Sequence, residues 1–225
     1  MKLKSPALIA LDMDNTLYEY QHAHEAGMKQ VADALFSRLG IRRGDWENHF
    51  NWSRDDVKRR LGNNASSHSR LLYFKSMLER LGVGGHFDLA LQLENTYWQF
   101  FLRAMQPAPG AKEFLEVCRA RGLPVVLITD LTLQIQLRKI LQLNFLNYIH
   151  GVITSEEVGG DKPNPSFIHY ARENLGLVTS DTWVVGDDLV KDKSFAQEIQ
   201  AEFFHVSADG NSKYSFDHLV RFLSK

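Results

Sequence analysis

The stretch "ALIALDMDNT", residues 7–16, joins five apolar residues to a polar run that carries Asp12, Asp14 and Thr16. A short apolar run bounded by polar residues is typical of a strand buried on both faces, as the strands of parallel sheets are. Asp12 and Asp14 are two residues apart, so they share one face while the chain stays extended. The stretch therefore predicts a buried strand that presents two carboxylates where it ends.

Three further apolar runs lead into polar groups in the same way: "VVLI" (125–128) into Thr129 and Asp130, "GVIT" (151–154) into "DKPNP" with Lys162, and "WVVG" (183–186) into Asp187 and Asp188. Helix-length stretches separate the runs, and "AEFFHV" (201–206) would add a last strand. Strands that alternate with helices favour a parallel sheet covered on both faces. Ligands of such sheets bind beyond the carboxyl ends of the strands, so we expect these polar groups to share one site.

Apolar residues at three- and four-residue spacing predict the helices. After the second strand they are Leu133, Leu137, Ile140 and Leu141, and the last helix would run from Phe216 to Leu223. Between about Tyr18 and Gln106 no strand is predicted. Three helices are indicated there: the first by Met28, Val31, Leu35 and Leu39, the second by Leu71, Phe74, Leu78 and Leu81, and the third by Leu91, Trp98, Phe101 and Leu102.

The turn-rich connector "QPAPG" (106–110) ends this region. The simplest interpretation is a core formed by residues 1–17 and 107–225, with a helical insertion at 18–106. The chain has 225 residues, a formal net charge of −1 and one cysteine. Nucleic acids and anionic membranes both attract concentrated basic surfaces, so this balance gives no case for either partner. With no internal disulfide and no convincing signal peptide or span, the expected location is the cytoplasm.

The reactive groups at the strand ends suit phosphoryl chemistry. Asp12, Asp14, Asp187 and Asp188 would repel one another strongly unless a cation lay among them, and hard oxygen ligands suit Mg²⁺. Lys162 can offset further negative charge and hold an anionic intermediate. Thr129 adds a hydroxyl donor, although a threonine at this place is also a common helix cap. Together these groups predict a site for a phosphoryl group.

The segments "DMDNT", the strand-terminal Thr129, "DKPNP" and "GDDLVKD" resemble, in order, the four motifs of the haloacid dehalogenase superfamily. This resemblance implies a Rossmann-like parallel sheet with helices on both faces, formed by 1–17 and 107–225, and a helical cap at 18–106 similar to that of the family's first subclass. Most family members are Mg²⁺-dependent phosphatases. The resemblance therefore implies a phosphohydrolase that acts on a small phosphorylated metabolite through an aspartyl-phosphate.

By the same resemblance, Asp12 is the nucleophile that attacks phosphorus. Asp14 is the general acid and base, a role for which a raised pKa is expected, and its backbone carbonyl ligates the metal. Lys162 pairs with Asp12 and the phosphoryl group, Thr129 binds the phosphoryl oxygens, and Asp187 is the third protein ligand to Mg²⁺.

Further positions have supporting roles in the family's pattern. Asp192 is expected to hold metal-bound water or Lys162, and Thr16 and Asp188 lie beside the site. The phosphate-binding positions implied by the resemblance are Met13, Thr129, Asp130 and Lys162. Asp130 and Asp188 depart from the residues that relatives commonly carry, so no role is assigned to their carboxylates, and that of Asp130 is expected to face away from the phosphate.

Other functions remain open on the sequence alone. A 2-haloacid dehalogenase uses the aspartate nucleophile without a general acid two residues later and without Mg²⁺, which Asp14 argues against. A phosphomutase would carry the same motifs. A regulatory phospho-acceptor protein without turnover would share the acidic pocket and the lysine, although such modules usually lack an insertion of this length. Neither the substrate nor the oligomeric state is determined by these residues.

Overall fold

The computed structural model describes residues 5–175 and 181–224. The chain forms two compact units. One is built from Met1–Tyr20 together with Gln106–Lys225, and the other is Gln21–Met105. We call the first the α/β unit and the second the helical unit, and we describe each by itself.

The α/β unit is built on a five-stranded sheet in the order β3-β2-β1-β4-β5. Its strands are β1 (Leu8–Leu11), β2 (Val125–Thr129), β3 (Gly151–Thr154), β4 (Thr182–Gly186) and β5 (Glu202–His205). All four neighbouring pairs are parallel. The predicted Rossmann-like α/β fold is therefore confirmed. Since β1 lies between β2 and β4, the residues that follow these three strands meet at one edge of the sheet.

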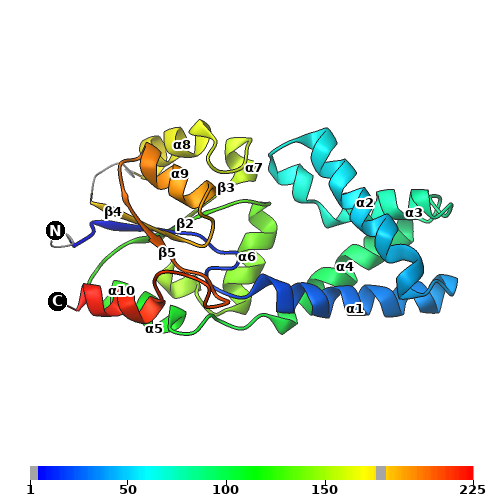
Figure 1. Cartoon of the computed structure of the whole chain (residues 1–225), viewed down its shortest axis with the longest axis horizontal. Helices are drawn as coiled ribbons and strands as arrows, with labels where there is room; N and C mark the ends of the chain where they lie inside the picture. The colour runs from blue at the N-terminus through cyan, green and yellow to red at the C-terminus, as the bar shows by residue number, and fades with distance from the viewer. Residues whose placement is uncertain (1–4, 176–180, 225) are drawn as a thin grey trace. The chain divides into compact units, whose positions relative to one another are not determined.

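Helices cover both faces of this sheet (Figure 1). On one face lie α5 (Ala111–Ala120) and α10 (Phe216–Leu223), whose Phe114 and Phe216 rings pack with centroids 5.3 Å apart. On the other lie α8 (Pro165–Leu175) and α9 (Lys191–Glu198), whose Phe167 and Phe195 join one buried cluster with residues of the strands. Burying a side chain of this size stabilises the fold by roughly 1.5–3 kcal/mol. The remaining segments are α6 (Leu133–Gln142), η2 (Leu146–Tyr148) and α7 (Ser155–Val158).

The buried face of α6 differs from the predicted one. Of the predicted apolar stripe, Ile140 is buried, but Leu137 and Leu141 are 40% and 57% exposed. The side chains that α6 buries are Ile135, Gln136, Lys139 and Ile140. The helix itself was predicted correctly but its buried face only in part, because Gln136 and Lys139 occupy much of the inward face.

The helical unit contains α1 (Tyr20–Leu39), α2 (Arg43–Leu61), η1 (Ala65–His68), α3 (Arg70–Arg80) and α4 (Phe87–Ala104). The sequence predicted α1, α3 and α4 but not α2, whose residues are mostly polar. Helix α2 still buries Trp46, Phe50 and Val57 at helical spacing. On α4 the predicted stripe is partly wrong, since Leu91 is 52% exposed while Trp98 and Phe101 are buried.

Aromatic side chains form much of the core of the helical unit. The Phe50 and Phe74 ring centroids are 5.4 Å apart, and those of Tyr97 and Trp98 are 5.0 Å apart. The nearly buried guanidinium of Arg70 lies 5.4 Å from the centroids of both Tyr97 and Trp98. Offset aromatic packing and a cation over a ring face each stabilise the core beyond the burial of apolar surface. The geometry of these contacts therefore contributes to the stability of the helical unit.

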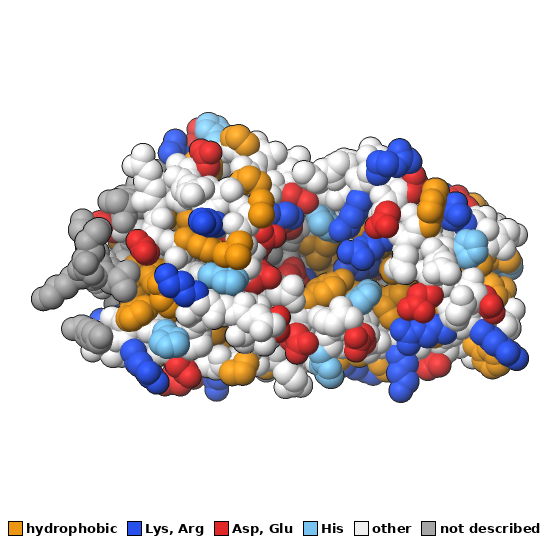
Figure 2. Space-filling view, viewed as in Figure 1, with side chains coloured by type: hydrophobic (Ala, Val, Ile, Leu, Met, Phe, Trp, Pro, Cys, Tyr) orange, Lys and Arg blue, Asp and Glu red, His pale blue; other side chains and the backbone are white. Residues whose placement is uncertain are grey.

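On the visible face of the molecule, acidic and basic side chains alternate over the surface of each unit (Figure 2). Within residues 5–175 and 181–224, no helix combines the length and the hydrophobicity needed to cross a lipid bilayer.

Candidate active site

The carboxyl ends of β1, β2 and β4 bring the predicted groups together. They line a cavity of about 180 Å³. Its lining consists of Asp12, Asp14, Asn15, Thr129, Asp130, Lys162, Asp187, Asp188, Lys191 and Asp192. Six of these side chains are carboxylates and two are lysines, so the cavity suits a ligand together with a cation that offsets negative charge.

Lys162 is the buried centre of the site. Its Nζ donates to Asp12 Oδ1 at 2.5 Å, to Asp192 Oδ1 at 2.6 Å and to the Ile128 carbonyl at 2.9 Å. These three bonds use its three protons, so the ammonium is fixed in direction. Burial lowers the pKa of Lys162, but the surrounding carboxylates, led by that of Asp12, outweigh this and hold the pKa well above its ordinary value. Lys162 is therefore charged.

The Asp130 carboxylate, to which no role could be assigned from sequence, holds the segment that carries Lys162. Its Oδ1 accepts the backbone N–H of Lys162 at 2.9 Å, and its Oδ2 pairs with Lys191 Nζ at 2.6 Å. Its carboxylate is thus committed to two partners of the chain, which offsets much of the negative charge that it adds to the cavity wall.

Asp12, Asp187 and Asp192 form a cluster that could hold a metal ion, since one carboxylate oxygen from each lies within 4.8 Å of the others. Burial, Asp192 and Asp188 raise the pKa of Asp187 to about 7, although Lys162 acts against them. Burial also raises the pKa of Asp12 well above its ordinary value, because the attraction of Lys162 only partly offsets it. Both shifts mean that the charged forms of these carboxylates are poorly stabilised, first by burial and then by their acidic neighbours, and a hard divalent cation would relieve both causes.

Asp192 is held rigidly within this cluster. Besides its bond to Lys162, its Oδ2 accepts the backbone N–H of Asp188 at 3.0 Å. A Cβ at Gly186 would lie 2.2 Å from Asp192 Oδ2, so only glycine permits this approach at the end of β4. The expectation that Asp192 holds Lys162 agrees with this geometry.

Asp188 is the second residue without a role from sequence. Its Oδ1 accepts the backbone N–H groups of Val190 at 2.8 Å and Lys191 at 2.9 Å. These groups stand at the start of α9, where backbone donors have no partner within the helix. Asp188 thus satisfies two backbone N–H groups at the start of α9, whose N-cap position is Val190, while its neighbour Asp187 contributes to the acidic cluster.

Thr16 and Met13 lie just after β1, and Thr129 is the last residue of β2. Thr16 Oγ1 donates to Asp12 Oδ2 at 3.3 Å, and the carbonyl of the buried Met13 accepts the Leu17 N–H at 3.0 Å in a tight turn. Thr129 is not the cap of α6, because that position belongs to Thr132. Thr129 instead lies among the residues that line the cavity.

Asp14 differs from what the sequence led us to expect. Its Oδ1 accepts from Lys139 Nζ at 2.5 Å and from the Tyr18 hydroxyl, and its Oδ2 accepts from Gln136 Nε2 at 3.1 Å. Burial raises the pKa of Asp14, but the charge of Lys139 and the hydrogen bonds of these three partners outweigh it and lower the pKa. The expectation of a raised pKa is wrong for the protein without ligands.

Sequence reasoning missed Lys139, Gln136 and Tyr18. Gln136 and Lys139 are three residues apart, which places them on one side of a helix. The leucines of the same helix hid this signal. Tyr18 follows "DMDNT" closely and had been placed in the insertion, yet it lies in the α/β unit.

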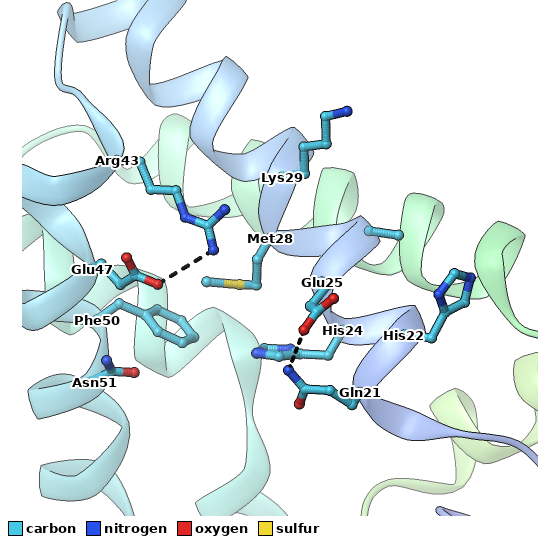
Figure 3. A pocket seen from close by; sticks show the side chains of 11 residues that line it. Gln21, His22, His24, Glu25, Met28, Lys29, Arg43, Glu47, Phe50 and Asn51 are labelled. Carbon is cyan, nitrogen blue, oxygen red and sulfur yellow. Dashed lines mark hydrogen bonds and ion pairs between the residues drawn. The ribbon is translucent and has the colours of Figure 1, made fainter. Parts of the chain in front are cut away.

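The helical unit has a pocket of its own, with a volume of about 460 Å³ (Figure 3). It is lined by Gln21, His22, His24, Glu25, Ala26, Met28, Lys29, Arg43, Glu47, Phe50 and Asn51. Arg43 pairs with Glu47 at 3.5 Å, and His24 Nδ1 lies 2.8 Å from the Tyr97 hydroxyl. Burial, with the nearby guanidinium groups of Arg70 and Arg54, lowers the pKa of His24 to about 4, so this ring is neutral at pH 7.

Comparisons with known proteins agree with this geometry. A family model described as haloacid dehalogenase-like hydrolase matches residues 6–199. The chain is 34% identical over 213 residues to the ribulose-1,5-bisphosphate 5-phosphatase of Halopiger xanaduensis, covering 93% of this chain and 89% of that protein. It is 29% identical over 195 residues to the glyceraldehyde 3-phosphate phosphatase of Methanocaldococcus jannaschii, covering 85% and 80% of the two chains.

A solved structure shares the fold at lower identity. The 2-haloacid dehalogenase of Pseudomonas syringae pv. tomato superposes with a TM-score of 0.74 at 17% identity, covering 96% of this chain and 97% of that one. Because this likeness concerns the fold alone, it does not separate dehalogenation from phosphate hydrolysis. Dehalogenation and phosphate hydrolysis must instead be distinguished by the side chains of the site.

Proposed function

Because the chain belongs to the haloacid dehalogenase-like hydrolase family and is a phosphatase of that family, we propose that it hydrolyses a small phosphorylated metabolite with Mg²⁺ through a phosphorylated Asp12. The observation that carries the proposal is the convergence of Asp12, Asp187 and Asp192 beside the charged Lys162. Both curated relatives described above are named for phosphorylated sugars or their derivatives. Sugar phosphates are therefore the first substrates to test.

In the first step, an Asp12 carboxylate oxygen attacks phosphorus as the bond from phosphorus to the leaving oxygen breaks. Asp14, in the form of the enzyme–substrate complex in which its carboxyl group is protonated, gives that proton to the leaving oxygen, which departs as an alcohol. In the second step, Asp14 takes a proton from water as the water attacks phosphorus and releases Asp12. The products are the alcohol and inorganic phosphate, and both carboxyl groups return to their starting states.

The other residues bind and orient the phosphoryl group. Lys162, fixed by its three bonds, offsets the charge of Asp12 and of the phosphoryl oxygens. The Thr129 hydroxyl accepts from Gln136 Nε2 at 2.7 Å and donates to the Asp130 carbonyl over a long 3.4 Å, a weak bond that its proton can exchange for a phosphoryl oxygen. The Lys162 charge and the Thr129 hydroxyl are in place before the substrate arrives, so little reorganisation is needed at the moment of reaction.

Asp12, Asp187 and the backbone carbonyl of Asp14 are the groups that we propose to hold Mg²⁺. Asp192 belongs to the same acidic cluster, but its oxygens already serve Lys162 and the Asp188 amide. We therefore assign it to the support of these groups. When bound, Mg²⁺ supplies a Lewis acid and positive charge for the phosphoryl oxygens.

We also propose that the helical unit selects the substrate, as the resemblance to a cap implies. Its pocket offers two cations, two carboxylates, amides and a neutral imidazole. A lining of mixed hydrogen-bonding groups suits a hydroxylated and charged metabolite better than an apolar one.

A panel of phosphorylated metabolites and p-nitrophenyl phosphate, assayed with Mg²⁺ and with a chelator, tests the proposal. We expect phosphate release that depends on Mg²⁺, and a loss of at least about 10⁴-fold in kcat for Asp12→Asn with the fold retained by circular dichroism. Near-normal turnover by Asp12→Asn would exclude the covalent route. Chloride release from a 2-haloacid without Mg²⁺, in the absence of phosphate release, would assign the dehalogenase reaction instead.

A further inference from the structure

Asp14 is anchored by three buried side chains that belong to none of the four motifs. Lys139 is 1% exposed, and Tyr18 and Gln136 are fully buried. The Lys139 ammonium also lies 5.5 Å from the centroid of the Tyr18 ring, so it has a carboxylate and an aromatic face as partners. Burying an ammonium costs several kcal/mol, and an ion pair seldom does better than apolar packing of the same volume. Stability alone therefore gives no reason for a lysine here.

The two oxygens of Asp14 are held unequally. Oδ1 receives both the Lys139 ammonium, at 2.5 Å, and the Tyr18 hydroxyl. Within residues 5–175 and 181–224, Oδ2 receives only the Gln136 amide, at 3.1 Å. Hydrogen bonds from a charged donor are about twice as strong as neutral ones, so Oδ1 is the anchored oxygen.

Gln136 divides its amide among several acceptors. Its Nε2 lies 2.7 Å from Thr129 Oγ1 and 2.7 Å from the Asp130 carbonyl, in addition to Asp14 Oδ2. The carboxylate and the carbonyl can only accept, so the group that faces them must be the NH₂ and not the carbonyl of the amide. Two amide protons serve three acceptors, and the longest of the three contacts is the one to Asp14. Oδ2 is thus the less committed oxygen.

We propose that Lys139, assisted by Tyr18, is a positioning residue that fixes Asp14 through Oδ1 and leaves Oδ2 to exchange the proton with the leaving group. This inference rests on the proposed function, since it assigns the means by which the acid and base of that reaction is oriented. When Oδ2 carries the proton, it passes to the leaving oxygen as the P–O bond breaks and the bond between Asp12 and phosphorus forms. Without Lys139, the Asp14 side chain can rotate away and this transfer slows.

Two substrates with different needs for a proton test the proposal. p-Nitrophenyl phosphate releases a weakly basic phenolate that departs without protonation, whereas benzyl phosphate releases a strongly basic alkoxide. General acid catalysis is worth about 10²–10⁴-fold. We expect Lys139→Met to lower kcat/KM for benzyl phosphate by about 10–100-fold, no more than the lower end of that range, because the variant keeps Asp14 and loses only its positioning. We expect the loss for p-nitrophenyl phosphate to be only about threefold, because kcat/KM covers the steps up to leaving-group departure.

The ratio of the two losses does not depend on the fraction of folded enzyme. Tyr18→Phe removes one hydroxyl from the same carboxylate oxygen and should shift the ratio in the same direction, which covers the case in which Lys139→Met does not fold. In an Asp14→Asn background, Lys139→Met should change the benzyl phosphate rate by no more than about twofold, since residues that act through one group are not additive. Arg138 is the exposed neighbour of Lys139 on α6, and Arg138→Met should leave kcat/KM unchanged for both substrates.

Equal losses for both substrates, or a further large loss in the Asp14→Asn background, would overturn the positioning role and leave Lys139 as a structural residue. That failure is distinct from failure of the proposed function. If the unaltered enzyme hydrolyses both substrates with Mg²⁺ and Asp12→Asn does not, the function stands whatever Lys139 does. If the unaltered enzyme hydrolyses neither of them nor any member of the metabolite panel, both proposals fall together.

Discussion

Asp187 and Asp188 are neighbours in the chain with separate tasks. Asp187 contributes to the acidic cluster with Asp12 and Asp192, whereas Asp188 accepts two backbone N–H groups at the start of α9. Adjacent residues that leave a strand point in different directions, so one can serve a ligand while the other serves the helix. We therefore expect a substitution of Asp187 to weaken metal binding and a substitution of Asp188 to lower stability.

For Asp187→Ala we expect Mg²⁺ affinity to fall by about 100-fold, at the upper end of the loss seen when groups that support a metal are removed. For Asp188→Ala we expect a change in affinity below about threefold and a loss of about 1 kcal/mol in the free energy of unfolding, the usual worth of a helix cap. Titration calorimetry with Mg²⁺ and urea unfolding measure the two quantities. An Asp187→Ala protein with unchanged Mg²⁺ dependence would refute the ligand assignment.

His24 predicts a pH dependence of stability. Its pKa is lowered from 6.5 to about 4, first by burial and then by Arg70 and Arg54, with Glu25 acting in the opposite direction. Between these two values the unfolded chain binds a proton that the folded chain does not. Above pH 6.5 the His24 ring is neutral in both states and does not destabilise the fold. As the pH falls from 6.5 towards 4, protonation of the unfolded chain lowers the free energy of unfolding.

The decline attributable to His24 should be about 1–3 kcal/mol, since one pKa unit corresponds to about 1.4 kcal/mol and the ring is partly exposed to solvent. Urea unfolding at pH 7 and at pH 4.5 measures it, and the same pair of measurements on His24→Gln removes the contributions of other groups. The decline should be smaller in His24→Gln. Equal declines in both proteins would show that His24 is not held neutral by the fold.

At the scale of elements, the strands could be predicted from sequence because each is an apolar run that ends in a reactive group. Parallel pairing then brings those groups to one edge of the sheet without further information. The faces of α6 could not be predicted in this way, because Gln136 and Lys139 bury polar groups against Asp14 and leave Leu137 and Leu141 exposed. A hydrophobic pattern assumes that polar residues face solvent, and a site with buried charge breaks that assumption.

Helix α2 was missed for a related reason. Its sequence is dominated by charged and polar residues, so the few that it buries, such as Trp46 and Phe50, carry little weight in a pattern over the whole segment. Four residues separate them, which is the spacing of one helical face. Attention to the large aromatic residues alone would have found this helix.

Gly27 is the residue of α1 that lies against Tyr97 of α4. A Cβ at this position would lie 2.8 Å from Tyr97 Cδ2 and 2.9 Å from the Tyr97 carbonyl oxygen, so α1 approaches α4 closely here. Alanine favours helices by about 1 kcal/mol over glycine. We nevertheless expect Gly27→Ala to destabilise the protein by about 1–3 kcal/mol, because overpacking against backbone cannot relax.

Gly44 of α2 is the matched control, since a Cβ there meets nothing within 4 Å. Gly44→Ala should leave the free energy of unfolding unchanged or raise it by up to about 1 kcal/mol. Urea unfolding of both variants gives the comparison. A Gly27→Ala protein as stable as Gly44→Ala would mean that α1 and α4 do not pack as described.

At the scale of the whole molecule, catalysis and selection are assigned to different units of the chain. The α/β unit contains every residue to which we assign a chemical step, and the helical unit contains a separate pocket with its own charged lining. Such a division lets the reaction stay constant while the choice of metabolite depends on other residues. The proposal can be tested by a change in the pocket that should alter selectivity and not chemistry.

Arg43 is the residue for this test. Its pair with Glu47, at 3.5 Å, is exposed and worth at most about 1 kcal/mol, so the guanidinium remains available to an anionic group of a ligand. We expect Arg43→Met to raise KM by about tenfold or more for the preferred metabolite, because one charge-assisted hydrogen bond is worth about 1.5–3 kcal/mol. With p-nitrophenyl phosphate, which carries no second anionic group, KM and kcat should stay unchanged. Arg59→Met, on the same helix but outside the pocket lining, is the control. An equal rise of KM for both substrates, or no rise for either, would remove substrate selection from this pocket.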